Sequence, residues 1–475
     1  MTPESTPRGV LIPLLVIATA QLMLVLDDSI VNIALPSIQT EFAVDPVHLP
    51  WVVNAYIVAF GALLLLGGRV GDVWGRRRTL QIGIAVFVLA SLVGGLAQGT
   101  EVLVAARAAQ GIGAAMAAPN ALALIATTFA DRRTRDSALS LYGAMSGLGI
   151  VVGLLLGGVL TGTLGWRWVF FINIPIGLIV LLGSRTLATP DRQGGRLGFL
   201  DAVWGTAGML ALVYAITRFG ENGFGDPVAY ALVAGAGVLL TFFVLTQRAS
   251  HTPLVPLSLF RDRNRVGAYL TMLGLAIGPM GAFYVITLYL QQVLEYSPLR
   301  TGLSWLPFAA GLVVGAGAAP KLLAQLAPRV VAAAGALIAA GSVLWFSSIS
   351  TTTGYWLHLA PAMILLGLGF GLGAITLTQA AVSHVNADKA GIASALLNSA
   401  QQIGVALGLA ILAGVAAGVT AQTQEVGGEA LVTGYGAALL VGAVILAASA
   451  VVAAMALDKT PWHVDEPAVS ALSQS

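Results

Sequence analysis

Long, uninterrupted apolar runs are the feature of this sequence that most limits its fold. A helix needs about 20 apolar residues to cross the hydrocarbon core of a bilayer. The runs are continuous rather than alternating, which favours membrane helices over the strands of a barrel. Fourteen of them are found in the 475 residues, at 10–35, 48–68, 79–98, 101–128, 137–162, 166–187, 199–219, 227–247, 265–292, 299–318, 329–348, 356–381, 390–418 and 431–457.

The composition also indicates an integral membrane protein. Only 9% of the residues are charged, whereas a soluble domain has about 25%. The chain has no cysteine, which excludes a disulfide framework, a thiolate metal site and a cysteine nucleophile. The five histidines lack metal-ligand spacing, and no nucleophile has a base beside it. We therefore expect neither an enzyme nor a bound cofactor or metal.

The basic residues predict the orientation of the chain. With the N-terminus inside, 19 of the 23 Lys and Arg residues fall in inner loops and tails and 3 in outer loops. Because inner loops are the basic ones, we expect both termini in the cytoplasm. Two longer inner loops divide the all-helical chain into a six-helix bundle at 1–187, an inserted pair with its linkers at 188–264, a second six-helix bundle at 265–457 and a tail at 458–475.

Two adjacent acids, Asp27 and Asp28, lie inside the first apolar run. A carboxylate at the bilayer centre costs about 2.5–3.5 kcal/mol, so it indicates a function. Arg107 is the one cation deep within a run and can pair with either acid. The alternative is an arginine that snorkels to the interface near Glu101. Because a nearby cation favours an ionised carboxyl and desolvation disfavours it, these residues are candidates for loading and releasing a proton.

Helix phase gives the two acids different surroundings. Neighbouring residues on a helix point about 100° apart. Asp28 shares a polar stripe with Gln21 and Asn32, whereas Asp27 shares its face with small or apolar residues. The pattern therefore predicts that Asp28 faces a watery cavity and Asp27 a neighbouring helix.

A glycine-rich loop with an acid and several arginines joins the second and third runs. Its glycines permit a tight turn and a close approach of two helices. Its acid and arginines can form a clasp between helix ends that a conformational change makes and breaks. The residues that we expect to act in this way are Gly68, Gly71, Asp72, Gly75, Arg76 and Arg77.

In combination, several stretches resemble the major facilitator superfamily, and within it the fourteen-helix drug:proton antiporters of the DHA2 type. The glycine-rich loop resembles motif A of that superfamily, although Val73 replaces its basic residue. The stretch from 26 to 36 resembles the first-helix motif, with Asp27 at the position of its acid. Arg107 opens a stretch similar to motif B, whose arginine is associated with proton transfer. Further matches lie at 166–177, 289–298 and 398–404.

The fifth run is similar to the antiporter motif, motif C. Leu154 stands where the family usually has proline, so the kink of that proline is missing. The small residues that allow close helix packing are retained, at Gly149, Gly153, Gly157 and Gly158.

The resemblance implies a secondary transporter that exports lipophilic small molecules in exchange for protons by alternating access. We expect a monomer in a bacterial inner membrane, with membrane lipids around it and no nucleic-acid partner. Two other functions stay open: a dedicated exporter of one endogenous metabolite or lipid, and a membrane sensor that transports nothing. The resemblance favours Asp27 as the proton carrier, while the helix phase leaves Asp28 as the alternative.

Other polar residues within the runs are candidates for a substrate cavity. For each of them, an interhelical hydrogen bond is the competing interpretation. The candidates are Asn32, Asn54, Gln110, Asn120, Tyr142, Tyr284, Gln291, Gln379, Asn398, Gln401 and Gln402.

Overall fold

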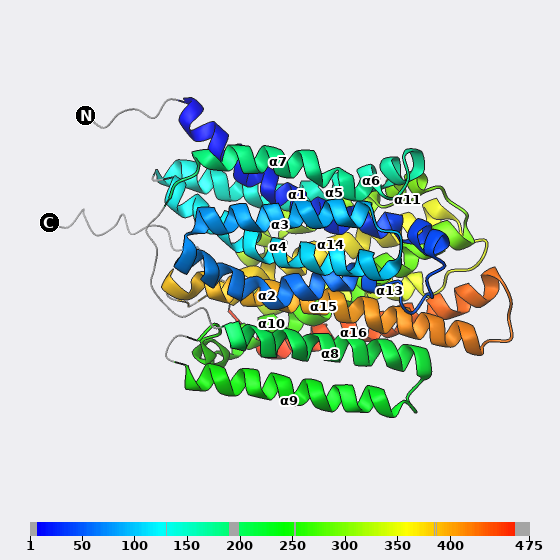
Figure 1. Cartoon of the computed structure of the whole chain (residues 1–475). Helices are drawn as coiled ribbons and strands as arrows, with labels where there is room; N and C mark the ends of the chain where they lie inside the picture. The colour runs from blue at the N-terminus through cyan, green and yellow to red at the C-terminus, as the bar shows by residue number, and fades with distance from the viewer. Residues whose placement is uncertain are drawn as a thin grey trace, which may run out of the picture.

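The computed structural model describes residues 7–129, 131–189, 199–250, 253–383, 385 and 387–460, and all regular elements in these residues are helices. Figure 1 shows the long helices lying side by side along one direction. The expectation of an all-helical chain without barrel strands is therefore confirmed for the described residues.

The helices fall into three consecutive groups. The first group comprises α1 (Pro7–Phe42), α2 (Trp51–Trp74), α3 (Arg76–Gly95), α4 (Thr100–Thr128), α5 (Arg132–Thr163), α6 (Trp168–Phe171), α7 (Asn173–Gly183) and η1 (Ser184–Thr186). The second comprises α8 (Phe199–Asn222), α9 (Pro227–Ala249) and the short η2 (Leu257–Arg261). The third comprises α10 (Arg263–Leu288), η3 (Tyr289–Val293), α11 (Pro298–Ser304), α12 (Leu306–Leu323), α13 (Pro328–Phe346), η4 (Tyr355–Leu359), α14 (Ala360–Val382), α15 (Ala387–Gln422) and α16 (Gly428–Ala456).

Twelve helical stretches in the described part of the chain are long and apolar enough to cross a membrane. Two shorter apolar stretches, Leu148–Thr163 in α5 and Val203–Phe219 in α8, accompany them. Each expected run overlaps one of these stretches. Some crossings are interrupted: α6 and α7 together form one stretch, as do α11 and α12, where Pro307 lies in the first turn of the second helix.

The first and third groups pack in the same pattern. In the first group, α1 packs on α5 and α7, while α4 packs on α2 and α3. In the third, α10 packs on α15 and α16, while α14 packs on α12 and α13. The first and third groups therefore repeat one pattern of helix packing. The two groups meet where α2 contacts α15 and where α5 contacts α11.

Helices α8 and α9 lie outside this repeated arrangement. Helix α8 packs against α2 and α15, covering the place where the two groups meet, and α9 packs on α8. Figure 1 shows α9 at the edge of the bundle. The exposed side chains of α9 are mostly apolar, which suits contact with lipid; they include Val228, Tyr230, Val233, Val238, Phe242, Val244 and Leu245.

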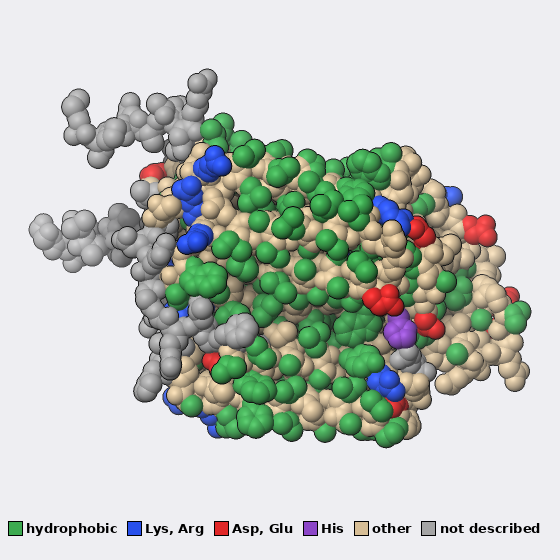
Figure 2. Space-filling model, in the orientation of Figure 1, with side chains coloured by type: hydrophobic (Ala, Val, Ile, Leu, Met, Phe, Trp, Pro, Cys, Tyr) green, Lys and Arg blue, Asp and Glu red, His purple; other side chains and the backbone are tan. Residues whose placement is uncertain are grey.

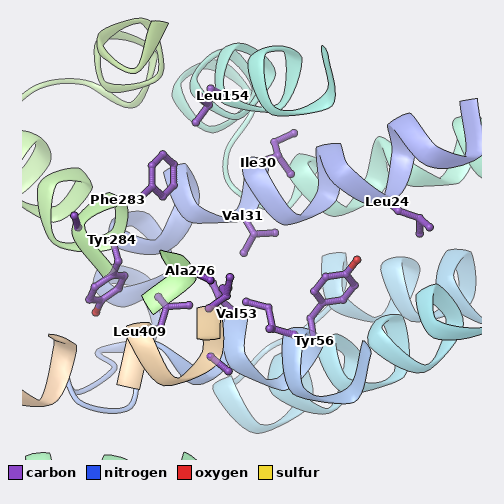
Figure 3. Packing of buried hydrophobic residues seen from close by; sticks show 14 of the residues in the cluster. Leu24, Ile30, Val31, Val53, Tyr56, Leu154, Ala276, Phe283, Tyr284 and Leu409 are labelled. Atoms are coloured by element: carbon purple, nitrogen blue, oxygen red, sulfur yellow. The ribbon is translucent and has the colours of Figure 1, made fainter. Parts of the chain in front are cut away.

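One apolar cluster extends through the first and third groups of helices. Figure 3 shows Val31 of α1, Val53 of α2, Ala276 of α10 and Leu409 of α15 within it. Figure 2 shows hydrophobic side chains over the middle of the visible face and charged side chains toward its two ends. The molecule thus has the apolar belt that a multi-pass membrane protein requires.

Candidate functional site

A buried ion pair joins the first helix to the fourth. Asp27 of α1 and Arg107 of α4 both have fully buried side chains, and Arg107 Nη1 lies 2.5 Å from Asp27 Oδ2. Charges buried in this way need partners, because desolvating an unpaired ion is costly. The pair therefore stabilises the contact of α1 with α4 and places one titratable group in the interior of the helical bundle.

Two amides complete the hydrogen bonding of the Asp27 carboxylate. Gln110 Nε2 donates to Asp27 Oδ1 over 3.0 Å, and Asn173 Nδ2 of α7 donates to the same oxygen over 2.7 Å. Gln110 Oε1 in turn accepts from Arg107 Nη1 at 2.9 Å. A guanidinium and two amides thus converge on one carboxylate from two other helices.

The remaining contacts of Arg107 fix its position. Its Nε donates to the carbonyl of Val52 in α2 over 2.9 Å, and its guanidinium carbon lies 4.5 Å from the centroid of the Tyr56 ring. Such a cation–π contact is strongest where water is excluded. The second terminal nitrogen, Nη2, is buried and has no hydrogen-bond partner in the described part of the chain. The guanidinium therefore keeps both N–H donors of Nη2 unused.

Helix α3 contributes to the same network through a serine. Gln110 Nε2 also contacts Ser91 Oγ at 2.8 Å, and Ser91 Oγ donates to the carbonyl of Phe87 over 2.8 Å. The site is therefore built by α1, α3, α4 and α7, with the backbone of α2 accepting from the arginine. We call Asp27, Arg107, Gln110 and Asn173 the polar cluster.

Asp28 lies outside the polar cluster. Its side chain is half-buried, and among the described residues its buried Oδ1 has no hydrogen-bond partner. Asn32 Nδ2 donates to the backbone carbonyl of Asp28 over 2.8 Å, while the buried Oδ1 of Asn32 and both amide atoms of Asn54 lack partners among the described residues. Buried polar atoms of this kind are satisfied by water or a ligand when one is present. The two neighbouring acids thus have different surroundings.

The other polar candidates divide by environment. Several are engaged between helices: Asn120 Nδ2 donates to the carbonyl of Gly67 over 2.9 Å, Gln291 Nε2 donates to that of Ile33 over 3.1 Å, and Tyr142 Oη lies 3.5 Å from the carbonyl of Ala118. The remaining candidates are the buried Tyr284, whose hydroxyl has no partner in the described chain, the buried Gln402, the half-buried Gln379 and Gln401, and the exposed Asn398.

The glycine-rich loop holds the ends of α2 and α3 together. Asp72 and Arg76 form an ion pair of 3.2 Å within the turn, and Arg76 Nη1 reaches the carbonyl of Ala123 in α4 at 3.4 Å. Gly75 has φ of 101°, a backbone conformation that favours glycine.

Three further residues of this loop, Arg77, Gly71 and Gly68, differ in how closely they approach their neighbours. Arg77 Nη1 donates to the carbonyl of Leu187 over 3.3 Å. A Cβ at Gly71 would lie 1.7 Å from Asn120 Oδ1, so any larger residue there would displace the Asn120 side chain, whereas one at Gly68 would lie 3.7 Å from Pro119.

The glycines of α5 face two different helices. A Cβ at Gly153 would lie 2.7 Å from Ser29 Cβ of α1, and Gly149 and Gly157 also face α1. A Cβ at Gly158 would lie 2.8 Å from the Cα atom of Leu299 in α11, across the contact between the first and third groups of helices. Leu154 is fully buried and α5 continues through it without interruption.

Further contacts join the two groups near the C-terminal end of α1. Gln292 Nε2 donates to Gln39 Oε1 over 2.8 Å, next to the bond from Gln291 to Ile33. Away from that end, midway along α2, Ser399 Oγ of α15 donates to the carbonyl of Gly61 over 3.0 Å. The groups are thus closed on one another at the end of the bundle opposite the start of α1.

Three members of the site could not be assigned a role from the sequence: Ser91, Tyr56 and Asn173. Asn173 lies in the stretch 166–177 that matched a family signature, and an amide in an apolar helix is a signal for a buried hydrogen bond. Its partner, however, is 146 positions away. Only the packed bundle shows that the two residues meet.

The fold and site define a multi-pass membrane protein with a charged pair in its interior, and comparison with known proteins gives its family. The model of the Major Facilitator Superfamily matches residues 17–409. The chain is 41% identical over 466 residues to the puromycin resistance protein pur8 of Streptomyces alboniger, covering 95% of this chain and 92% of that protein. It is 39% identical over 405 residues to the cephamycin export protein CmcT of Amycolatopsis lactamdurans, covering 84% of this chain and 83% of that protein.

A solved structure supports the fold. A bacterial homologue of the human lysosomal transporter Spinster, in an inward-facing and unoccupied conformation, aligns with a TM-score of 0.65 at 16% identity, covering 95% of this chain and 97% of that one. The chain belongs to the Major Facilitator Superfamily. It is a membrane transporter rather than an enzyme, and the resemblance found in its motifs is confirmed.

Proposed function

We propose that the chain is a DHA2-type exporter that moves lipophilic small molecules out of the cell in exchange for protons. The observation that carries this proposal is the polar cluster. It holds a carboxylate and a guanidinium, both fully buried, against one another inside the helical bundle. Ionisable groups at such a depth indicate a proton or ion pathway.

The proposed architecture has fourteen transmembrane helices in a 6+2+6 arrangement with both termini in the cytoplasm. The repeated packing pattern of the first and third groups supports two six-helix bundles, at 1–187 and 265–457, with the segment 188–264 inserted between them. The basic inner loops support the orientation. In this orientation, the contact of Gln39 with Gln292 lies at the outer side. The structure then corresponds to a state closed to the outside.

The proposed coupling step is the transfer of a proton onto Asp27. In the described state the carboxylate accepts from Arg107, Gln110 and Asn173. A protonated carboxyl loses its charge and with it most of its attraction to the guanidinium, which weakens the contact of α1 with α4. Release of that proton on the inner side restores the ion pair. Asp28, half-buried and one residue away, is the alternative acceptor.

The names of two similar proteins suggest the class of substrate. Pur8 is named for puromycin resistance and CmcT for cephamycin export, so antibiotics are the first compounds to test. Asn32, Asn54 and Tyr284, whose buried polar atoms lack partners in the described residues, are proposed to contact the substrate. A dedicated exporter of one metabolite is the second candidate, because CmcT is named for a single compound.

The test is transport of puromycin by the full chain in proteoliposomes with an imposed pH gradient. We expect puromycin flux that depends on the pH gradient. Treating the vesicles with a protonophore should stop this flux, and the Asp27→Asn variant should lack it. Asp28→Asn removes the same charge one residue away and tests the alternative acceptor; we expect it to retain gradient-dependent flux. Undiminished gradient-dependent flux in the Asp27→Asn, Asp28→Asn double variant would contradict proton coupling at this site. Binding without flux under all conditions would favour a sensor.

A further inference from the structure

A pocket lined by arginines lies where α9 ends and the next linker begins. It has a volume of about 510 Å³ and is lined by Gln247, Arg248, Leu257, Phe260 and Arg261. Both arginines are exposed. Neither makes a hydrogen bond or ion pair with any other described residue, so both guanidinium groups are available to a ligand. The proposed function makes no use of this pocket.

Buried contacts hold the wall of the pocket in place. Gln247 is 3% exposed, and its Oε1 accepts from the backbone N–H of Val255 at 3.1 Å. Leu254 and Val255 are buried against Leu63, Leu65 and Leu66 of α2, Phe243 of α9 and Leu396 of α15. This wall of the pocket therefore loses little freedom when a ligand binds.

Arg265 fixes the other side of the pocket. It is 5% exposed, and it donates from Nη1 to the carbonyl of Leu259 in η2 over 3.1 Å and from Nε to that of Ala381 in α14 over 3.2 Å. Asp262 is the acid next to Arg261, and its Oδ1 accepts from the backbone N–H of Arg265 at 2.9 Å. That acid therefore has a partner of its own at the start of α10.

The surroundings of the pocket favour an amphipathic anion. Phe260, with 42% of its surface exposed, and Leu257 give the pocket an apolar part. The pocket adjoins the end of α9, whose exposed side chains are mostly apolar; Leu245, close to the pocket in sequence, is 49% exposed. A phospholipid can place its phosphate between the two guanidinium groups and its acyl chains along α9, which a free phosphate cannot do.

We propose that this pocket binds the headgroup of an anionic phospholipid from the cytoplasmic leaflet, with Arg248 and Arg261 contacting the phosphate. The leaflet follows from the proposed orientation of the chain; the chemistry of the ligand does not depend on transport. The bound lipid would bridge α9 and η2 and so fasten the inserted helix pair to the start of the second six-helix bundle.

The experiment measures lipid binding to the delipidated full chain in neutral detergent by native mass spectrometry. Dioctanoyl phosphatidylglycerol, dioctanoyl phosphatidylcholine and inorganic phosphate are the probes. We expect the wild type to prefer phosphatidylglycerol and the Arg248→Gln, Arg261→Gln double variant to bind it about 30-fold more weakly. Arg185→Gln is the matched control, because Arg185 is exposed in η1, outside the pocket, and should leave binding unchanged.

Each other outcome contradicts the proposal. If the double variant and the wild type bound phosphatidylglycerol with equal affinity, the two arginines would not contribute to lipid binding. If phosphatidylcholine bound as strongly as phosphatidylglycerol, the pocket would not require an anionic headgroup. Binding of inorganic phosphate as strong as that of the lipid would indicate a site for free anions. If the double variant does not fold, as judged by its melting curve, the single variants carry the same test, with an expected loss of about fivefold each.

Discussion

Asp27 and Arg107 are the two residues whose replacement we most clearly expect to lower the free energy of unfolding. Each side chain is fully buried, and each is the other's only partner of opposite charge within 4 Å among the described residues. Removing one member of a buried pair leaves an uncompensated charge and costs about 3–5 kcal/mol, whereas replacing both members together is much less costly. The stability of single and double variants should therefore differ in a way that reveals the pair.

We expect Asp27→Asn and Arg107→Gln each to destabilise the protein by about 3–5 kcal/mol and the double variant to recover most of this loss. The measurement is a double-mutant cycle by denaturant unfolding in detergent. Asp28→Asn is the control, because Asp28 lies outside the ion pair, and we expect it to change the stability little. Losses that simply add in the double variant would show that the two charges do not interact. Transport should remain abolished in the stabilised double variant.

Single residues also show the limit of reasoning from sequence. Charge in an apolar run identified Asp27 and Arg107, and helix phase separated the two acids, because both arguments depend only on local spacing. The contributions of Asn173 and Gln292 depend on contacts 146 and 253 positions away. No local pattern encodes such a partner. Nor does it distinguish Asn120, engaged with the backbone of α2, from Asn54, whose amide lacks a partner in the described structure.

At the scale of elements, α5 belongs to the first group of helices and packs against α11 of the third group. Gly153 packs on α1 within its own group, whereas Gly158 packs on α11 of the other. Apolar runs predicted α5 as a helix, but they could not predict which glycine faces which partner. A side chain at Gly158 affects only the state in which α5 and α11 are in contact, while one at Gly153 affects the packing of α1 on α5.

We therefore expect Gly158→Ala to open the outer contact of the two groups. Overpacking costs about 1–3 kcal/mol, which corresponds to a shift of about 5- to 150-fold between the two states. The chain has no cysteine, so Thr301→Cys gives a unique thiol in α11, at a side chain that is fully buried in the described state. Labelling by a membrane-impermeant maleimide from outside should rise in Gly158→Ala. It should not rise in Gly153→Ala, and equal labelling of both variants would contradict the assignment of faces.

The turn between α8 and α9 is held by an acid outside the apolar stretches. Asp226 caps α9 through Val228 N at 2.8 Å and accepts from Arg218 Nε at 2.7 Å. The hydrogen bond from Arg218 lowers the pKa of Asp226 below its usual value of 3.8. Because the folded pKa is lowered, the stabilisation is fully present above that usual value and is lost as the pH falls through the lowered one.

The consequence is a pH-dependent difference between the wild type and Asp226→Asn. We expect hydrogen exchange in residues 222–230 to be faster in the variant at neutral pH, and the difference to disappear as the pH falls below about 4. Asp201→Asn, in the first turn of α8, is the control and should leave the exchange of this turn unchanged. A difference that persists unchanged in acid would show that the carboxylate charge is not what holds the turn.

At the scale of the whole molecule, the sequence predicted the order of the apolar runs but not how the first and third groups of helices meet. Membrane helices gain little from burying apolar surface against one another, since lipid is equally apolar. Their arrangement therefore depends on small residues and on a few polar contacts between distant segments. Gln39 and Gln292 make one of these contacts at the proposed outer side.

Fixing this contact should stop transport while leaving the inner side accessible. We expect a short bifunctional methanethiosulfonate reagent to join Gln39→Cys to Gln292→Cys, because Nε2 of the native Gln292 lies 2.8 Å from Oε1 of the native Gln39. The joined protein should lose puromycin flux at least tenfold, and a thiol reductant should restore it; each single-cysteine variant, treated alike, controls for modification. Substrate binding from the inner side should persist, because alternating access needs the outer contact to open only for release. Undiminished flux through the joined protein would show that the two groups do not separate at this end during the cycle.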